Sequence, residues 1–410
     1  MKPHILLTYS CLILGLSLWS CNNGSGGIQG PALLVSWQGN QFGYINEEGE
    51  TVVPAQFAFA MPFAEGYGAI NIGGDASKGY MPEGGKWGFV NQDGKIKINP
   101  KYFSPVLSGA PFNLRELGDV SHEGYIFSEG LAAVKDITKY WKYINMQDSV
   151  VIDGSKLRIL SARRFHDGIA NVLIDNSPTG EDLWAYIDKK GNIVIPPSFK
   201  FPAEFEDGLA FVVDARNRRK VIDRQGNELY KQYIFVTPFH NGYAAVRPYW
   251  RGQKKVDDLT KRRVVLIDRD GAFHTPPDFD WIGRFGEGMA PALVGSKLAH
   301  PIIYPQLLTS TEETGGKWGF IDYKGEFKIN PTYQEAKGFI NGFAPVKRGG
   351  LWGYLRPDRS MISGFEFRWA GFFENGLAPV RLGPIHNDYD GLYAYINTSG
   401  EIIWIERGRG

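Results

Sequence analysis

Residues 87–94 read Trp-Gly-Phe-Val-Asn-Gln-Asp-Gly, and this short phrase decides the fold because variants of it recur along the whole chain. Its general form is an aromatic residue, Gly or a small residue, two β-formers, Asn or Asp, two variable residues and Gly. A recurrence of roughly 34 to 54 residues predicts stacked copies of one supersecondary unit. Further copies occupy residues 42–49, 184–191, 221–226, 265–271, 318–325 and 393–400, and weaker copies start at Trp141 and Trp352.

Each copy fits the middle of a unit of three antiparallel strands. A Gly-Leu-Ala-x-Val strand, as at 130–134 or 376–380, precedes the Trp-Gly strand. The Asn or Asp can accept a backbone hydrogen bond from two residues on, and the closing Gly can take a positive φ, so the phrase ends in a hairpin turn. A third, alternating strand follows, and we expect proline to end it because proline lacks an N–H. The prolines at that place are Pro54, Pro100, Pro196, Pro276 and Pro331.

Aromatic residues follow those prolines at two regular positions, and we expect them to pack one unit on the next. From residue 32 to 406 we count about nine such units, and helical periodicity is nearly absent. Even the longest helical candidate, 301–311, is interrupted by Pro305 and reads as a loop. The sequence therefore predicts an all-β array, either a propeller-like or curled toroid or, as the alternative, an open β-solenoid. The core aromatics are Phe57, Tyr102, Phe199, Phe279 and Tyr333, then Phe63, Phe205, Phe285 and Phe339.

The first residues predict export and a lipid anchor. Residues 1–20 have the charge and apolar run of a signal peptide, and Leu18-Trp19-Ser20 at their end is followed by Cys21. That ending resembles the lipobox of bacterial lipoproteins, so we expect the thiol of Cys21 to be lipidated; the alternative is an ordinary secretory signal with an incidental cysteine. Residues 21–31 read as a flexible tether, 32–406 as the β domain and 407–410 as a tail. The other cysteine, Cys11, lies in the segment that would be removed, so no disulfide is expected.

The bulk composition excludes one class of partner. A net charge of +1 with 22% charged residues gives no dominating basic field, so we expect no nucleic-acid binding. A hydrophobic content of 43% and an aromatic content of 14% supply an extended core.

The repeat resembles a known family. Residues 86–94 followed by Ile98-Asn99-Pro100-x-Tyr102, and residues 317–325 followed by Ile329-Asn330-Pro331-x-Tyr333, are similar to the WG (KWG) repeat of bacterial proteins. The resemblance implies a β-rich repeat architecture in an envelope protein and carries over no catalytic residue. Asn22 and Asn23 stand where a surface-export signal would be acidic. A periplasm-facing outer-membrane location is therefore expected rather than the cell surface.

No catalytic or cofactor constellation is evident. The histidines lack metal-ligand spacing, and His166 and His240 share one slot before a turn, which indicates a structural role. We expect no cofactor and no metal, and we do not expect an enzyme. A Ca²⁺ array is the alternative use of the acidic and amide residues before the turn glycines, although turn formation explains them better. These residues are Glu65, Glu129, Asp167, Asp207 and Glu287, with Asn241, Asn341 and Asn375.

The irregular connections between the first and second strands carry the best candidate for binding. They are long at 71–86, 173–183, 247–262, 295–317 and 381–392, and their common topological place predicts that they emerge on one face. The basic and aromatic segment of the third connection gives the candidate partner-binding residues, although a solvated hairpin tip is the simpler interpretation. A further insertion at 104–127 follows a third strand. The candidates are Tyr249, Trp250, Arg251, Lys254, Lys255 and Arg262.

Together these features predict a lipid-anchored binding or scaffold module of the cell envelope that recognises a protein or a saccharide. The alternative is a carbohydrate-active enzyme of the propeller type, which would need two carboxylates from different units about 5 to 10 Å apart. The oligomeric state does not follow from the sequence.

Overall fold

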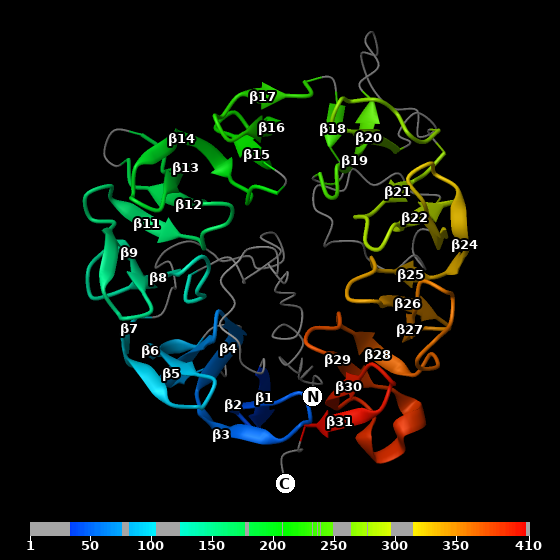
Figure 1. Cartoon of the computed structure of the whole chain (residues 1–410), viewed down its shortest axis with the longest axis horizontal. Coiled ribbons are helices and arrows are strands. Elements are labelled where there is room, and N and C mark those ends of the chain that lie inside the picture. Colours follow the sequence, from blue (N-terminus) through cyan, green and yellow to red (C-terminus); the bar gives the residue numbers. More distant parts are fainter. Residues whose placement is uncertain are drawn as a thin grey trace, which may run out of the picture.

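The computed structural model shows a ring of small antiparallel β-sheets (Figure 1). It describes residues 33–75, 82–103, 124–176, 180–206, 208–231, 233–235, 237, 239–248, 264–276, 278–296 and 315–406. Within these residues the regular structure consists of strands β1 to β31 and a short 3-10 helix, η5. None of the helical structure described there is long and apolar enough to cross a membrane. The predicted all-β repeat array is confirmed.

The first four units of the ring run from residue 34 to residue 201. Unit 1 contains β1 (Leu34–Gln38), β2 (Gln41–Ile45) and β3 (Thr51–Phe57), and unit 2 contains β4 (Phe59–Ala64), β5 (Tyr67–Asp75), β6 (Glu83–Asn91) and β7 (Ile96–Tyr102). Unit 3 contains β8 (Leu131–Lys135), β9 (Trp141–Asn145) and β10 (Val150–Asp153), and unit 4 contains β11 (Ile159–Ala162), β12 (Ile169–Ile174), β13 (Leu183–Asp188) and β14 (Ile193–Phe201).

The other five units complete the ring. Unit 5 contains β15 (Leu209–Asp214), β16 (Arg219–Asp223) and β17 (Glu228–Leu229), and unit 6 contains β18 (Tyr233–Phe235), β19 (Tyr243–Pro248) and β20 (Val265–Asp268). Unit 7 contains β21 (Trp281–Ile282), β22 (Ala290–Val294), β23 (Lys317–Ile321) and β24 (Phe327–Tyr333). Unit 8 contains β25 (Glu335–Ala336), β26 (Ala344–Arg348) and β27 (Leu351–Leu355), and unit 9 contains β28 (Phe367–Ala370), β29 (Leu377–Leu382), η5 (Pro384–Tyr389), β30 (Tyr393–Asn397) and β31 (Ile402–Ile405).

Several units have four strands where the sequence predicts three. The segment after the proline and its aromatic forms an extra strand, because β4 pairs with β5 and opens the next sheet in the order β4-β5-β6-β7. The sequence predicts a boundary between units after Phe63. The structure instead places this boundary before residue 59. In two places a strand joins neighbouring units into one sheet, through β14 with β15 and through β27 with β28.

The prediction that proline ends the third strand is wrong, because Pro54, Pro100 and Pro331 lie inside β3, β7 and β24. These strands lie at the outer rim of the ring (Figure 1), where a missing N–H breaks no ladder. Each prolyl segment bulges across the Gly of the Trp-Gly pair. A Cβ on Gly319 would lie 2.5 Å from the Ile329 carbonyl oxygen and 2.8 Å from the Pro331 nitrogen. This close approach explains why Gly follows Trp.

In five units the third residue of the recurring phrase is a buried tyrosine that ties the unit to the next one. The hydroxyl of Tyr44 donates to the Met61 carbonyl at 2.8 Å, and the hydroxyl of Tyr354 donates to the Gly371 carbonyl at 2.8 Å. Burial raises the pKa of both phenols, so they remain protonated donors. Tyr143 and Tyr186 donate equivalent hydrogen bonds to the carbonyls of Arg163 and Ala203.

The expected packing role of the aromatic residues is confirmed. Phe205, Phe285 and Phe339 are buried between units, and among the predicted core aromatics only Phe63 is partly exposed.

The ring closes by packing of the last unit on the first. The Tyr395 hydroxyl donates to the Val35 carbonyl at 3.0 Å, and the rings of Trp37 and Trp404 lie edge to face with centroids 5.0 Å apart. Strands β1 and β31 accordingly lie side by side in Figure 1. An open β-solenoid would leave both ends exposed, so that alternative is wrong.

Candidate binding face

The antiparallel order of the strands sends the connections of each unit to two opposite ends of its sheet. In unit 2, the β4–β5 turn and the β6–β7 turn lie at one end, and the β5–β6 connection lies at the other. We call the first end of all units the turn face and the second the loop face. All five long connections predicted from the sequence fall between strands equivalent to β5 and β6. Their described parts therefore belong to the loop face, as expected.

The candidate partner-binding residues and the lipidation site lie outside the described residues. This holds for Tyr249, Trp250, Arg251, Lys254, Lys255 and Arg262, for Cys21, and for nearly all of the 104–127 insertion. The structure nevertheless fixes the topological place of the 247–262 connection, because it leaves β19 and returns before β20. That connection therefore starts and ends at the loop face.

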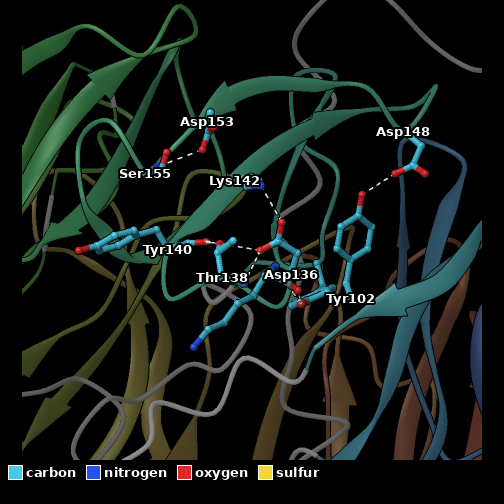
Figure 2. A network of polar contacts seen from close by, with 10 residues as sticks. Tyr102, Asp136, Thr138, Tyr140, Lys142, Asp148, Asp153 and Ser155 are labelled. Carbon is cyan, nitrogen blue, oxygen red and sulfur yellow. Dashed lines mark hydrogen bonds and ion pairs between the residues drawn. The ribbon is translucent and has the colours of Figure 1, made fainter.

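The best-described connection of the loop face is the short one between β8 and β9, at residues 136–140. The Asp136 carboxylate accepts hydrogen bonds from the Thr138 amide at 2.7 Å, the Thr138 hydroxyl at 2.6 Å and the Lys142 ammonium at 2.6 Å (Figure 2). Burial raises the pKa of Asp136, but the hydrogen bonds from Lys142 and Thr138 outweigh burial and lower it below its usual value. The carboxylate stays ionised at neutral pH and holds the loop in one conformation.

A buried carboxylate joins this connection to unit 4. The Asp175 side chain is only 1% exposed, and it accepts hydrogen bonds from Lys139 at 2.6 Å and from the Tyr140 hydroxyl at 3.2 Å. Arg158 forms an ion pair with it at 3.2 Å. The hydrogen bond to Asp175 raises the pKa of Lys139, so both cations remain charged while their side chains stay largely exposed.

The loop face of unit 9 carries a second ordered connection. Helix η5 contains His386, whose ring stacks on the ring of Phe367; the ring centroids are 6.0 Å apart and the interplanar angle is 7°. Next to it, Arg368 and Asp390 form a bidentate ion pair with both distances at 2.6 Å. This connection is recognisable in the sequence by its length, whereas residues 136–140 are few and match no binding motif. The only local signal was an isoleucine between polar residues.

The turn face repeats one chemistry in almost every unit. In the β13–β14 turn, the Asp188 carboxylate accepts from the amides of Lys190 and Asn192 at 2.9 and 2.8 Å. Burial raises the pKa of Asp188, but the bonds from Asn192 and Lys190 outweigh burial and lower it. Gly191 completes the turn with φ +82°. The predicted Asn/Asp–Gly turn is confirmed.

The acidic and amide residues before the other turn glycines link neighbouring units. All of those described have positive φ. The Glu65 carboxylate accepts from the amides of Glu129 and Gly130 at 2.6 and 2.9 Å, and Glu129 in turn accepts from Gly168. Turn formation therefore explains these residues. No group of three or more His, Cys, Asp or Glu side chains placed to hold a metal ion occurs in the part of the chain that the structure describes.

Two titratable groups depart far from ordinary behaviour without forming a catalytic pair. Burial raises the pKa of Glu374 to about 8; this turn-face residue lies near Tyr395, which forms the closing contact with Val35. Burial lowers the pKa of Lys337 to about 8; its ammonium donates to the Ala370 carbonyl at 2.7 Å and lies near Trp352 and Trp369. Both side chains belong to junctions between units, so burial on packing explains why their pKa values are shifted.

The recurring Trp-Gly strand, the outer prolyl bulge and the closing hairpin turn together define the repeat. A family described as "WG containing repeat" matches residues 42–74, 87–102, 184–214, 221–247, 266–297, 318–352 and 352–383. This chain belongs to the WG-repeat family. The match covers seven segments distributed along the ring, which agrees with the resemblance seen in residues 86–102 and 317–333. The WG repeat supplies the scaffold, and the family match by itself gives none of its residues a chemical role.

Comparison with other proteins adds little to this assignment. No curated protein matches the chain. Among solved structures, it is similar to the computationally designed Ika8 protein, with 10% identity, a TM-score of 0.38, and coverage of 70% of this chain and 88% of that one. BamB from Moraxella catarrhalis has 10% identity and a TM-score of 0.33 over 65% and 79% of the two chains. A structure titled as the eukaryotic initiation factor has 12% identity and a TM-score of 0.38 over 93% and 89%.

Proposed function

We propose that this WG-repeat protein is a lipid-anchored binding module of the bacterial cell envelope, and that it recognises a protein or a saccharide through its loop face. The observation that carries the proposal is the difference between the two ends of the sheets. Turns of nearly uniform sequence occupy one face, whereas connections of varied length and composition emerge on the other. Variable loops on one face of a repeat array are the usual place for recognition.

The point where the chain enters the ring supports this orientation. Leu34 pairs with Ile45, which directly precedes the Asn46–Gly49 turn, so β1 begins at the turn face. The residues between Cys21 and Leu33 span at most about 40 Å when fully extended, and as a flexible coil about 20 Å. A lipid on Cys21 would therefore hold the turn face towards the membrane. The loop face would then point into the aqueous compartment.

Deletion of residues 251–261 tests the binding role. We expect the deletion to reduce partner recovery in a pull-down from solubilised envelopes, with the folded state confirmed by an unchanged unfolding midpoint. As a matched control, alanine at Thr398 and Ser399 changes an exposed turn of the turn face and should leave recovery unchanged. Equal recovery from all three proteins would contradict the assignment of binding to this loop.

The lipid anchor is tested separately with Cys21→Ser. We expect the variant to lose incorporation of a radiolabelled fatty acid and to leave the membrane fraction. Retention of the label would show that Cys21 is not the acceptor. The enzyme alternative would be favoured by hydrolysis of an envelope glycan that stops when a single carboxylate is replaced.

A further inference from the structure

One side chain of the loop face is exposed far beyond the others of its kind. Ile137 is 86% exposed, more than any other large hydrophobic residue in the described part of the chain, and Ile385 follows at 69%. Ile137 lies in the β8–β9 connection, at the edge of unit 3 nearest unit 4. Exposing an aliphatic side chain to water gains nothing for folding, and its transfer to an apolar environment is favourable.

Hydrogen bonds to the Asp136 carboxylate hold the loop that carries Ile137. The Asp136 carboxylate binds both polar groups of Thr138 and the ammonium of Lys142, so the residues on either side of Ile137 are fixed (Figure 2). The Thr138 hydroxyl also reaches the Tyr140 carbonyl at 3.1 Å. A side chain presented on such a loop loses little conformational entropy when it is bound.

Two cations belong to the same loop-face cluster: Lys139 follows Ile137 by two residues, and Arg158 shares the Asp175 carboxylate with Lys139. Lys139 and Arg158 both contact the buried carboxylate of Asp175, and their side chains are 59% and 46% exposed. Because Asp175 is 1% exposed, its negative charge faces the interior while the two positive groups face solvent. Asp136 is paired with Lys142, so the most exposed charges of this cluster are the Lys139 and Arg158 cations, and Asp175 fixes where they lie.

We propose that Ile137 inserts into an apolar socket on a partner protein and that Lys139 and Arg158 face an acidic rim of that socket. This inference rests on the proposed function and names the chemistry of one contact. Charge complementarity favours an acidic rim, and Arg is enriched among the residues that dominate binding energy at interfaces. A saccharide would gain no hydrogen bond from an isoleucine, and an anchored turn face would direct this loop away from the lipid surface.

A photocrosslinking amino acid at position 137 of the full, lipidated chain tests the proposal in native envelopes. We expect a crosslink to a protein, and mass spectrometry of the adduct should locate it at an aliphatic residue with Asp or Glu nearby. The crosslink yield should fall severalfold at high salt, because exposed charges are screened. With the identified partner purified, Ile137→Ser should weaken binding at least tenfold and Lys139→Gln about threefold or more.

Matched variants keep the result interpretable. Ile385→Ser removes the other strongly exposed isoleucine of the loop face and should leave this contact unchanged. Urea unfolding should show that Ile137→Ser and Lys139→Gln fold as stably as the parent chain; Arg158 remains on Asp175 in the second variant.

Other outcomes would overturn the inference. These are the absence of a protein crosslink, an adduct with lipid only, binding of the soluble chain to vesicles of phosphatidylcholine and phosphatidylglycerol through Ile137, or a contact site without acidic residues. If crosslinks arise from position 385 but not from position 137, the proposed binding role stands and only the Ile137 contact fails.

Discussion

The turn face and the loop face are two ends of the same strands, yet they are built on different principles. On the turn face, side chains form hydrogen bonds with the backbone and link units. Asp188 accepts from an amide of its own turn, and Glu65 accepts from an amide in the turn of the next unit. On the loop face, the described side chains hold loops, as Asp136 does, and Asp175 links two units, but groups such as Ile137 are left exposed. The difference teaches that the recurring residues build the ring and that the irregular ones are available for recognition.

The largest expected effect comes from a glycine of the turn face. Gly49 has φ +79°, and a Cβ there would lie 2.6 Å from the carbonyl oxygen of Ile403 across the closing junction. We expect Gly49→Ala to lower the free energy of unfolding by about 2 to 4 kcal/mol, from left-handed strain and a backbone clash. Gly391 on the loop face has φ +85° but only the flexible end of Arg381 at 3.7 Å, so Gly391→Ala should cost about 1 kcal/mol. Equal losses in urea unfolding would break the comparison.

A pair of carboxylates gives the next effect. Asp322 on the turn face accepts from the amides of Lys324 and Glu326 and pairs with Lys328 at 2.8 Å. We expect Asp322→Ala to cost about 1 to 2 kcal/mol, because two turn amides lose their acceptor. Asp390 on the loop face forms an ion pair with the exposed Arg368, and Asp390→Ala should cost less than Asp322→Ala because solvent screens exposed charges. Thermal unfolding of both variants checks the order, and a larger loss at Asp390 would reverse it.

Glu374 gives the turn face a predicted pH dependence. Burial raises its pKa from 4.5 to about 8, so between these values the folded protein holds a proton that the unfolded chain releases. This contribution to stability is therefore complete below about pH 4.5 and is lost as the pH rises through about 8. We expect Glu374→Gln to flatten the decline in unfolding midpoint between about pH 4.5 and pH 8, the ordinary and the raised pKa of this carboxyl. An unchanged slope in the variant would exclude Glu374 as its source.

The smallest expected effect lies on the loop face. Ile385 is 69% exposed on η5, so Ile385→Ser should change the free energy of unfolding by no more than about 0.5 kcal/mol. Chemical denaturation measures this. A loss above about 1 kcal/mol would show that η5 stabilises the ring, and would contradict the view that exposed loop-face residues contribute little to stability.

Sequence reasoning predicted most of the scaffold and little of the site. It found the hairpin turns because Asn or Asp followed by Gly fixes them locally, within a few residues. It missed the extra strand β4, since a strand formed by residues 59–64 is recognisable only from its pairing with β5. It placed Pro54 and Pro100 at strand ends because the absent N–H is a local fact, whereas the outer position that makes the proline harmless is not. Residues 136–140 escaped notice for the same reason, as their partner Asp175 comes from the next unit.

The sequence by itself determined the repeat, its turns and its aromatic core, because each depends on interactions within one unit or on a fixed spacing between neighbours. Only the tertiary structure decided that the ring closes. The angle between units is the sum of many small packing choices, and the contact that reports it, from Tyr395 to Val35, joins residues at opposite ends of the chain. The same long-range assembly puts Lys139 and Arg158 around Asp175, and with them the charged setting of Ile137.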